Sequence, residues 1–250
     1  MEAEFSESSF GFALTYEIIS QNPSAIVAAP QFPSLISEGS VGGGYDVRLD
    51  LGYFLFLQFK LSEHMEGIRA GQTTPLGLPY YRFWITQRTR SMQQQLLADL
   101  DNAGESVFYA APAFIEQDLF NNHFRNGLIM TNSVFVKPNS IGYLTDDFPH
   151  CVAFNPDSNV GYFCSEPQEI ALSSANDIKR HLYAVRLAAA QSSSPPSLIE
   201  IAIKLKNILT RNHIDPPEIA VSTIPEALKY VGFVSQAYFN CEAIFISGKA

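Results

Sequence analysis

The segment at residues 53–61, YFLFLQFKL, constrains the fold of this chain more than any other. Its first residues are apolar at odd and even positions alike, which is typical of a central strand covered on both faces. Only Gln58 and Lys60 interrupt this pattern. A strand of this kind needs a layer on each side, so the chain is predicted to be an α/β protein.

Lys60 is the informative residue of this segment. Burying an ammonium group without a partner is costly, so Lys60 needs a nearby carboxylate, a water molecule or a bound anion. The preceding segment, residues 45–51, alternates polar and apolar residues as a half-buried strand does, and it contains Asp46. Asp46 is therefore the expected partner of Lys60.

The turn between these two segments decides which residues face each other. A two-residue turn would place Asp46 opposite Leu57, whereas a three-residue turn would place it opposite Gln58, with Lys60 on the same face. We predict the three-residue turn, because Gly52 can adopt the left-handed conformation that it needs.

The remaining elements follow from periodicity, caps and breakers. Helices are expected at 6–21, 90–103, 173–190 and 198–209, and strands at 25–30, 80–85, 107–111 and near Val134 and Val152. We expect one domain over residues 1–170 and a mainly helical region over 171–250, packed on the first or used for partner binding. The apolar helix at 198–209 is a core element or, alternatively, an interface for a partner or a second copy.

In this order of elements, GGGYD followed by FLQFK resembles the PD-(D/E)xK restriction-endonuclease-like superfamily. Its core runs helix, three strands, helix, strand, with a mixed sheet, an Asp on the second strand and (E/Q)xK on the third. The Gln variant is similar to the Mrr-like enzymes. The resemblance covers about residues 6–112.

The resemblance implies a metal-dependent nuclease that hydrolyses DNA phosphodiester bonds, in the setting of a prokaryotic anti-phage or restriction system. It implies Mg²⁺ or Mn²⁺ held by the Asp46 carboxylate, the Gln58 amide oxygen and the Phe59 carbonyl. Lys60 would position the attacking water or stabilise charge on the phosphate.

Glu17 is expected to supply a further acid, because its spacing from Phe10 and Leu14 directs it from the apolar face of the first helix toward the sheet. An acid on the first helix near the metal is also similar to the superfamily pattern. Glu38 is an alternative. Phosphate contacts are expected from a local group of polar residues: Arg82, Arg88, Arg90, Gln93 and Gln94.

Overall charge limits the possible partners. Sixteen Lys and Arg against 25 Asp and Glu give a net charge of −9, so no global positive field draws the protein to nucleic acid. DNA affinity would then come from an oligomer or a protein partner. Three cysteines without CxxC spacing indicate a reducing cytoplasm, and neither a secretion signal nor a membrane span is expected.

A second hypothesis is a catalytically inactive nuclease-like scaffold that serves as an interaction subunit, with Lys60 and Asp46 as a structural ion pair. Asp146, Asp147 and His150 could be metal ligands or an acid-base pair, although a turn with a solvated acidic pair is preferred. Cys151 and Cys164 are interpreted as core residues, and Gly42 to Gly44 as a turn.

Overall fold

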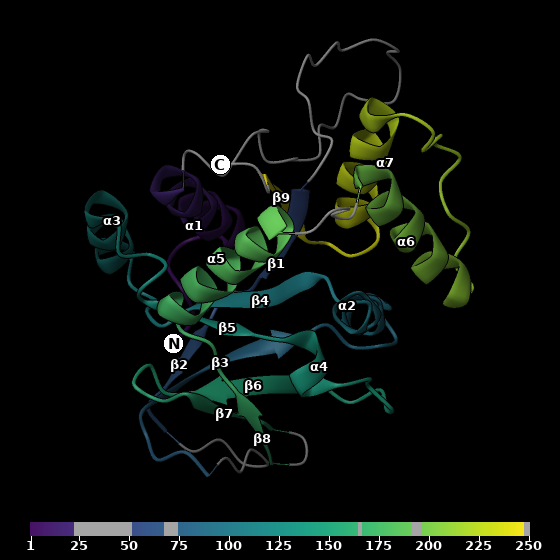
Figure 1. Cartoon of the computed structure of the whole chain (residues 1–250). Coiled ribbons are helices and arrows are strands. Elements are labelled where there is room, and N and C mark those ends of the chain that lie inside the picture. The colour runs from purple at the N-terminus through teal and green to yellow at the C-terminus, as the bar shows by residue number, and fades with distance from the viewer. Residues whose placement is uncertain (23–51, 68–74, 165–166, 192–196, 248–250) are drawn as a thin grey trace.

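The computed structural model describes residues 1–22, 52–67, 75–164, 167–191 and 197–247. The chain is an α/β protein with a mixed sheet A, an antiparallel sheet B and, in the described part, seven helices (Figure 1). The helices are α1 (Glu7–Gln21), α2 (Gln93–Asn102), α3 (Gln117–Asn126), α4 (Pro138–Ile141), α5 (Ala175–Gln191), α6 (Leu198–Arg211) and α7 (Ile224–Ala237). The strands are β1 (Gly52–Phe59), β2 (Glu63–Met65), β3 (Tyr80–Ile85), β4 (Ser106–Pro112), β5 (Ser133–Val136), β6 (His150–Phe154), β7 (Val160–Phe163), β8 (Gln168–Ala171) and β9 (Glu242–Ser247).

Sheet A has the strand order β5-β4-β1-β9, and sheet B has the order β2-β3-β6-β7-β8. β1 runs parallel to β4 and antiparallel to β9. Its residues Phe54 to Leu57 are all almost fully buried. The predicted central strand is therefore confirmed.

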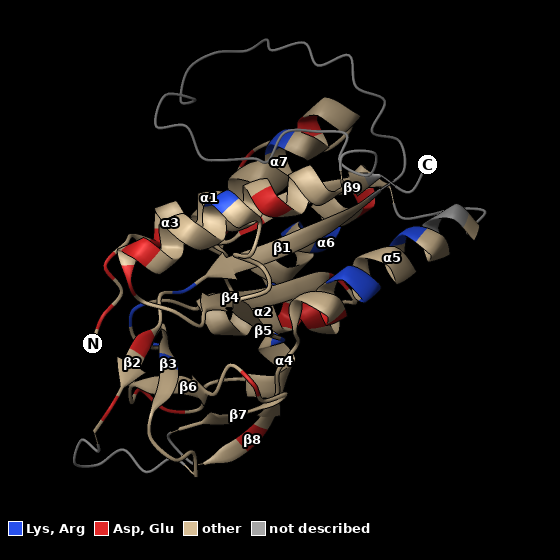
Figure 2. Cartoon of the chain, turned by 90° about the vertical axis from the view of Figure 1, so that its left-hand side faces the viewer, with Lys and Arg blue, Asp and Glu red and all other residues tan. Residues whose placement is uncertain are grey.

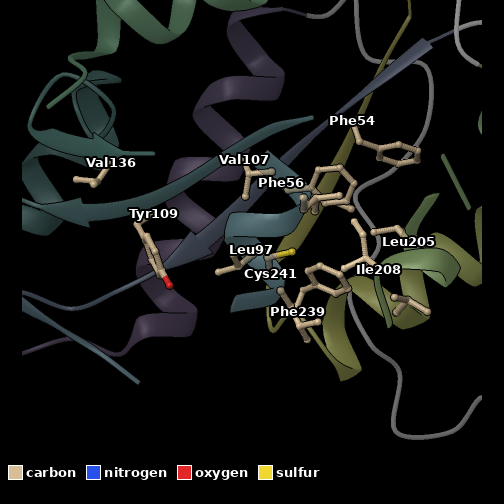
Figure 3. Packing of buried hydrophobic residues seen from close by; sticks show 14 of the residues in the cluster. Phe54, Phe56, Leu97, Val107, Tyr109, Val136, Leu205, Ile208, Phe239 and Cys241 are labelled. Carbon is tan, nitrogen blue, oxygen red and sulfur yellow. The ribbon is translucent and has the colours of Figure 1, made fainter. Parts of the chain in front are cut away.

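The two faces of β1 lie in two different cores. Leu55 and Leu57 pack with the buried sides of α1, α3 and α5. Phe54 and Phe56 pack with α2, α6, α7 and the inner face of sheet B. Figure 3 shows this second core, in which Phe54 and Phe56 lie among side chains of β4, α6 and the residues that precede β9. The even-numbered and odd-numbered side chains of β1 are thus buried in different cores.

Several predicted elements are confirmed with small changes in their bounds. Ser6 caps α1 with its side chain, and Ser197 forms a reciprocal capping box with Glu200 at the start of α6. α2 begins at Gln93, three residues later than expected, and Gly104 after its end has the positive φ of 86° that favours glycine. The predictions at 25–30, Glu38, Gly42 to Gly44 and 45–51 lie outside the described residues.

The hairpin partner predicted for Phe56 of β1 is wrong. The three-residue turn would place Arg48 opposite Phe56, but Phe56 has Val107 of β4 on one edge and Ala243 of β9 on the other. A strand buried on both faces is best extended by another apolar strand, and Ala243 to Ile246 are apolar throughout. Asp46 itself lies outside the described residues.

The C-terminal region adds more than helices. β9 forms an edge of sheet A, and residues of α6 and α7 share one core with β1. The interior side chains of α6, among them Leu205 and Ile208, are fully buried within the chain. Among the described helices, none is both long and apolar enough to cross a membrane.

Candidate functional site

The carboxyl end of β1 carries two buried polar side chains, Gln58 with an exposed fraction of 1% and Lys60 with 9%. Gln58 lies on the same face as Phe54 and Phe56, and therefore points toward α2. Its Oε1 accepts a hydrogen bond of 2.6 Å from Nε2 of Gln93, and its Nε2 donates to the Phe59 carbonyl at 2.8 Å. Gln58 is thus fixed by α2 and by its own strand.

Gln93 extends these contacts into a chain that we call the β1–α2 polar network: Gln58, Lys60, Thr86 and Gln93. Nε2 of Gln93 also donates to the Phe239 carbonyl at 3.1 Å, and its Oε1 accepts from Oγ1 of Thr86 at 3.0 Å. Nζ of Lys60 donates to Thr86 Oγ1 at 3.5 Å. The network joins sheet A to the residues that follow sheet B's β3.

Lys60 has the least complete set of contacts in this network. Burial lowers the pKa of its ammonium group, and the Glu7 carboxylate at the start of α1 opposes this shift. Among the described residues, no carboxylate lies within 4.0 Å of Nζ. The ring of Tyr109 lies 5.9 Å from Nζ and offers only a weak cation–π contact. The buried cation therefore lacks a close anionic partner in the described part of the chain.

Glu17 is buried as expected, with an exposed fraction of 4%, but the structure does not bring it to Gln58 and Lys60. Its Oε2 accepts from the backbone N–H of Met130 at 3.2 Å, and its Oε1 accepts from Gln21. α1 packs on the face of Leu55 and Leu57, whereas Gln58 points to the other face. The prediction that Glu17 faces the network is wrong because helix periodicity gives burial and not the side of the sheet.

The arginines that were predicted to contact phosphate lie in different surroundings. Arg82 is 2% exposed, and its guanidinium forms an ion pair of 2.6 Å with Glu63, which also accepts from Trp84. Arg88 pairs with Asp147 at 3.1 Å on the surface. Arg90 lies in the exposed turn before α2. Arg82 is thus held by an acid within the fold, and only Arg88 and Arg90 are exposed.

Gln93 and Gln94 are also internal. Gln94 is fully buried, donates to the carbonyls of Pro138 and Gly142, and accepts from the Tyr109 hydroxyl. A side chain with these contacts anchors α2 to α4 and β4. The expected contact of Gln93 and Gln94 with phosphate is therefore not supported by their burial.

The group at Asp146 to His150 forms an acid–imidazole pair. Nε2 of His150 lies 2.8 Å from Oδ1 of Asp146, and the buried imidazole stacks on Phe163 with ring centroids 4.9 Å apart. The backbone N–H of Phe148 lowers the pKa of Asp146. Asp147 pairs with Arg88 instead, so the two acids serve different partners.

The oxygen atoms proposed for a metal are of the right chemical type but are already hydrogen-bonded. Mg²⁺ and Mn²⁺ prefer hard oxygen ligands, which the Gln58 amide and the Phe59 carbonyl are. Each of them accepts from an amide N–H₂ group, of Gln93 and Gln58 respectively. In the described part of the chain, no group of three His, Cys, Asp or Glu side chains could hold a metal ion. These two oxygen atoms alone therefore do not make a metal site, and a metal here would need a further carboxylate.

Sequence reasoning missed Thr86 and Glu7. Thr86 directly follows β3, and a hydroxyl at the end of a strand was the available signal. Glu7 lies in the first turn of α1, where an acid is explained by the helix dipole alone. Their proximity to Lys60 depends on how separate elements pack.

Comparison of the chain with protein-family models, curated proteins and solved structures finds no match.

Replacing Gln93 with leucine should lower the free energy of unfolding by about 2–3 kcal/mol, because Gln58, Thr86 and the Phe239 carbonyl each lose a partner. Urea unfolding monitored by circular dichroism measures this. Gln191→Leu, at the exposed end of α5, is the control and should change the value by less than about 0.5 kcal/mol. An equal effect of both substitutions would contradict the role of the network.

Proposed function

We propose that this protein is a metal-dependent nuclease of the restriction-endonuclease-like type, and that it hydrolyses DNA phosphodiester bonds at the carboxyl end of β1. The observation that carries the proposal is Lys60: a buried ammonium beside Gln58, with no carboxylate within 4.0 Å in the described part of the chain. A buried cation needs an anion, and a scissile phosphate together with Asp46 would supply it.

In this proposal each residue has a limited task. Lys60 orients the attacking water or stabilises the negative charge that develops on the phosphate. Asp46, Gln58 and Phe59 supply oxygen ligands, and Gln58 must release Gln93 to do so. A bound Mg²⁺ or Mn²⁺ would offset charge on the phosphate and lower the pKa of a coordinated water.

DNA binding needs help from outside this chain. The net charge is −9, and Figure 2 shows acidic residues on the N-terminal segment, with basic residues along α5. A homo-oligomer or a basic protein partner would provide the missing phosphate contacts. We place the protein in a reducing cytoplasm, as an effector of a prokaryotic anti-phage or restriction system.

A non-catalytic scaffold is the second candidate function, and the closure of the β1–α2 polar network favours it. Gln58 and Gln93 satisfy each other, and Arg82 is held by Glu63. In that case Asp46 would form only a structural ion pair with Lys60.

The substitution Asp46→Asn separates the two candidates. A nuclease should lose cleavage of plasmid DNA in Mg²⁺ or Mn²⁺, and Asp46→Asn should also lose the rise in melting temperature that the metal gives to the parent protein. In a scaffold, the same substitution should lower the free energy of unfolding by about 3 kcal/mol, because the buried ammonium of Lys60 is left without its partner. Plasmid cleavage and melting curves with and without metal measure these quantities. A large fall in stability, with no metal-dependent stabilisation of the parent protein, would overturn the nuclease proposal.

A further inference from the structure

Cys151 and Cys164 lie opposite each other on neighbouring strands of sheet B. In the antiparallel pair of β6 and β7, Val152 is the partner of Phe163, and the next position places Cys151 opposite Cys164. The backbone N–H of Cys164 donates to the Cys151 carbonyl at 2.9 Å, so the ladder continues through this pair. Opposed residues in such a pair have Cα atoms about 5.5 Å apart, a separation that a disulfide spans without backbone movement.

Both thiols point away from the core that contains Phe54 and Phe56. Val152 and Phe163 face that core, so their neighbours along the strands face the other side of sheet B. Cys164 packs there against the small cluster of Met65, Tyr80 and Ala153 and is partly exposed, whereas Cys151 is 4% exposed. An oxidant can therefore reach Cys164 first, with Cys151 directly behind it.

The surroundings divide the two thiols into a nucleophile and a proton donor. A hydrogen bond from Cys151 lowers the pKa of Cys164, and the nearby guanidinium of Arg82 adds to this effect. The same hydrogen bond and burial raise the pKa of Cys151. When protonated, Cys164 donates to the Tyr162 carbonyl at 3.4 Å. Reactive cysteines are typically partly exposed and lie near a cation, and Cys164 meets both conditions.

We propose that Cys164 and Cys151 form a dithiol site that a peroxide oxidises to an intramolecular disulfide. The Cys164 thiolate attacks the peroxide, so that an S–O bond forms, the O–O bond breaks and the leaving hydroxide takes up a proton to become water. Cys151 then attacks the Cys164 sulfur, the S–S bond forms, the S–O bond breaks, and the proton of Cys151 leaves with the second water. Two thiols lose two electrons to one hydrogen peroxide. This proposal does not depend on the proposed nuclease function.

The test uses the full, reduced chain under native conditions with hydrogen peroxide as the probe. After quenching with N-ethylmaleimide and denaturation, we expect Cys151 and Cys164 to carry no maleimide, and a cross-linked peptide that contains both and is two hydrogen atoms lighter than the two reduced peptides together. Dithiothreitol should restore both thiols. Cys164 should react about tenfold or more faster than Cys241, which is 2% exposed and whose pKa is raised by burial.

Two variants make the assignment specific. Cys241→Ser should form the same disulfide at the same rate as the parent chain. Cys151→Ser should stop at a sulfenic acid on Cys164, which dimedone traps. The proposal is overturned if peroxide leaves all three thiols free in the folded parent chain, or if the cross-link joins two chains or includes Cys241. Circular dichroism before and after treatment verifies that the reacting protein is folded.

Discussion

Replacing Lys60 with methionine should abolish DNA cleavage and at the same time raise the free energy of unfolding. Methionine keeps most of the apolar stem and removes the ammonium group. Among the described residues, no carboxylate lies within 4.0 Å of that group. Replacing a buried charge by an apolar group of similar size stabilises proteins by about 1–4 kcal/mol in favourable cases. We expect a gain of about 1–3 kcal/mol and cleavage below about one hundredth of the parent rate.

The pH dependence gives this prediction a sign. The pKa of Lys60 is lowered in the folded chain from 10.5, so unfolding takes up a proton between the two values. The parent protein therefore loses stability as the pH falls from 10.5 toward the folded pKa. In Lys60→Met this part of the pH dependence should be absent, because no ammonium group titrates at that position. Urea unfolding at a series of alkaline pH values measures both slopes.

Lys137 provides a matched control. Its Nζ lies 2.8 Å from Oδ1 of Asp101, which is 5% exposed, and it also lies over the Phe108 ring. Lys137→Met leaves that carboxylate without its cation, so the free energy of unfolding should fall by about 1–3 kcal/mol while DNA cleavage per folded molecule is retained. If Lys60→Met destabilises the chain as Lys137→Met does, Lys60 is a structural ion-pair partner and the nuclease proposal loses its main support.

Replacing Glu242 with glutamine should remove most of the loss of stability between pH 5 and pH 8. Glu242 lies on β9 opposite Leu57, with an exposed fraction of 3%. Oε2 accepts from Gln236 at 3.1 Å, while Oε1 has no hydrogen-bond partner in the described part of the chain. Burial raises the pKa of this carboxyl group from 4.5 to about 8.

The sign follows from proton uptake. Between pH 4.5 and about 8, the folded chain keeps the Glu242 proton and the unfolded chain releases it, so stability falls as the pH rises through this range. A shift of this size corresponds to a contribution of up to about 5 kcal/mol. Glu242→Gln keeps the shape and the neutral state, so its advantage over the parent should grow from near zero at pH 5 to several kcal/mol at pH 8.

Urea unfolding of both proteins at pH 5, 6, 7 and 8 measures this difference. Glu169→Gln is the control, because it makes the same change at an exposed position of β8. Equal slopes for Glu242→Gln and the parent would show that the folded chain ionises Glu242 at an ordinary pH.

Much of the candidate site could be predicted, but only one position at a time. The apolar run at 53–61 predicted a central strand, and its two polar residues predicted a buried Gln58 and Lys60. Gln93 and Gln94 at the start of α2 were predicted to contact phosphate, whereas the structure shows Gln93 hydrogen-bonded to Gln58. Whether a buried amide side chain hydrogen-bonds to a second amide depends on which helix packs beside it.

Most helices and strands could be located from local patterns, because periodicity, caps such as Ser6 and Ser197, and breakers such as Gly104 act over a few neighbouring residues. Contacts between distant parts of the chain pair β9 (Glu242–Ser247) with β1 and place Glu17 and Gln58 on opposite faces of sheet A. The same holds for the facing thiols of Cys151 and Cys164. Strand partners and the sides of a sheet are chosen by competition among distant apolar surfaces for burial, and no local pattern of residues records the outcome of that competition.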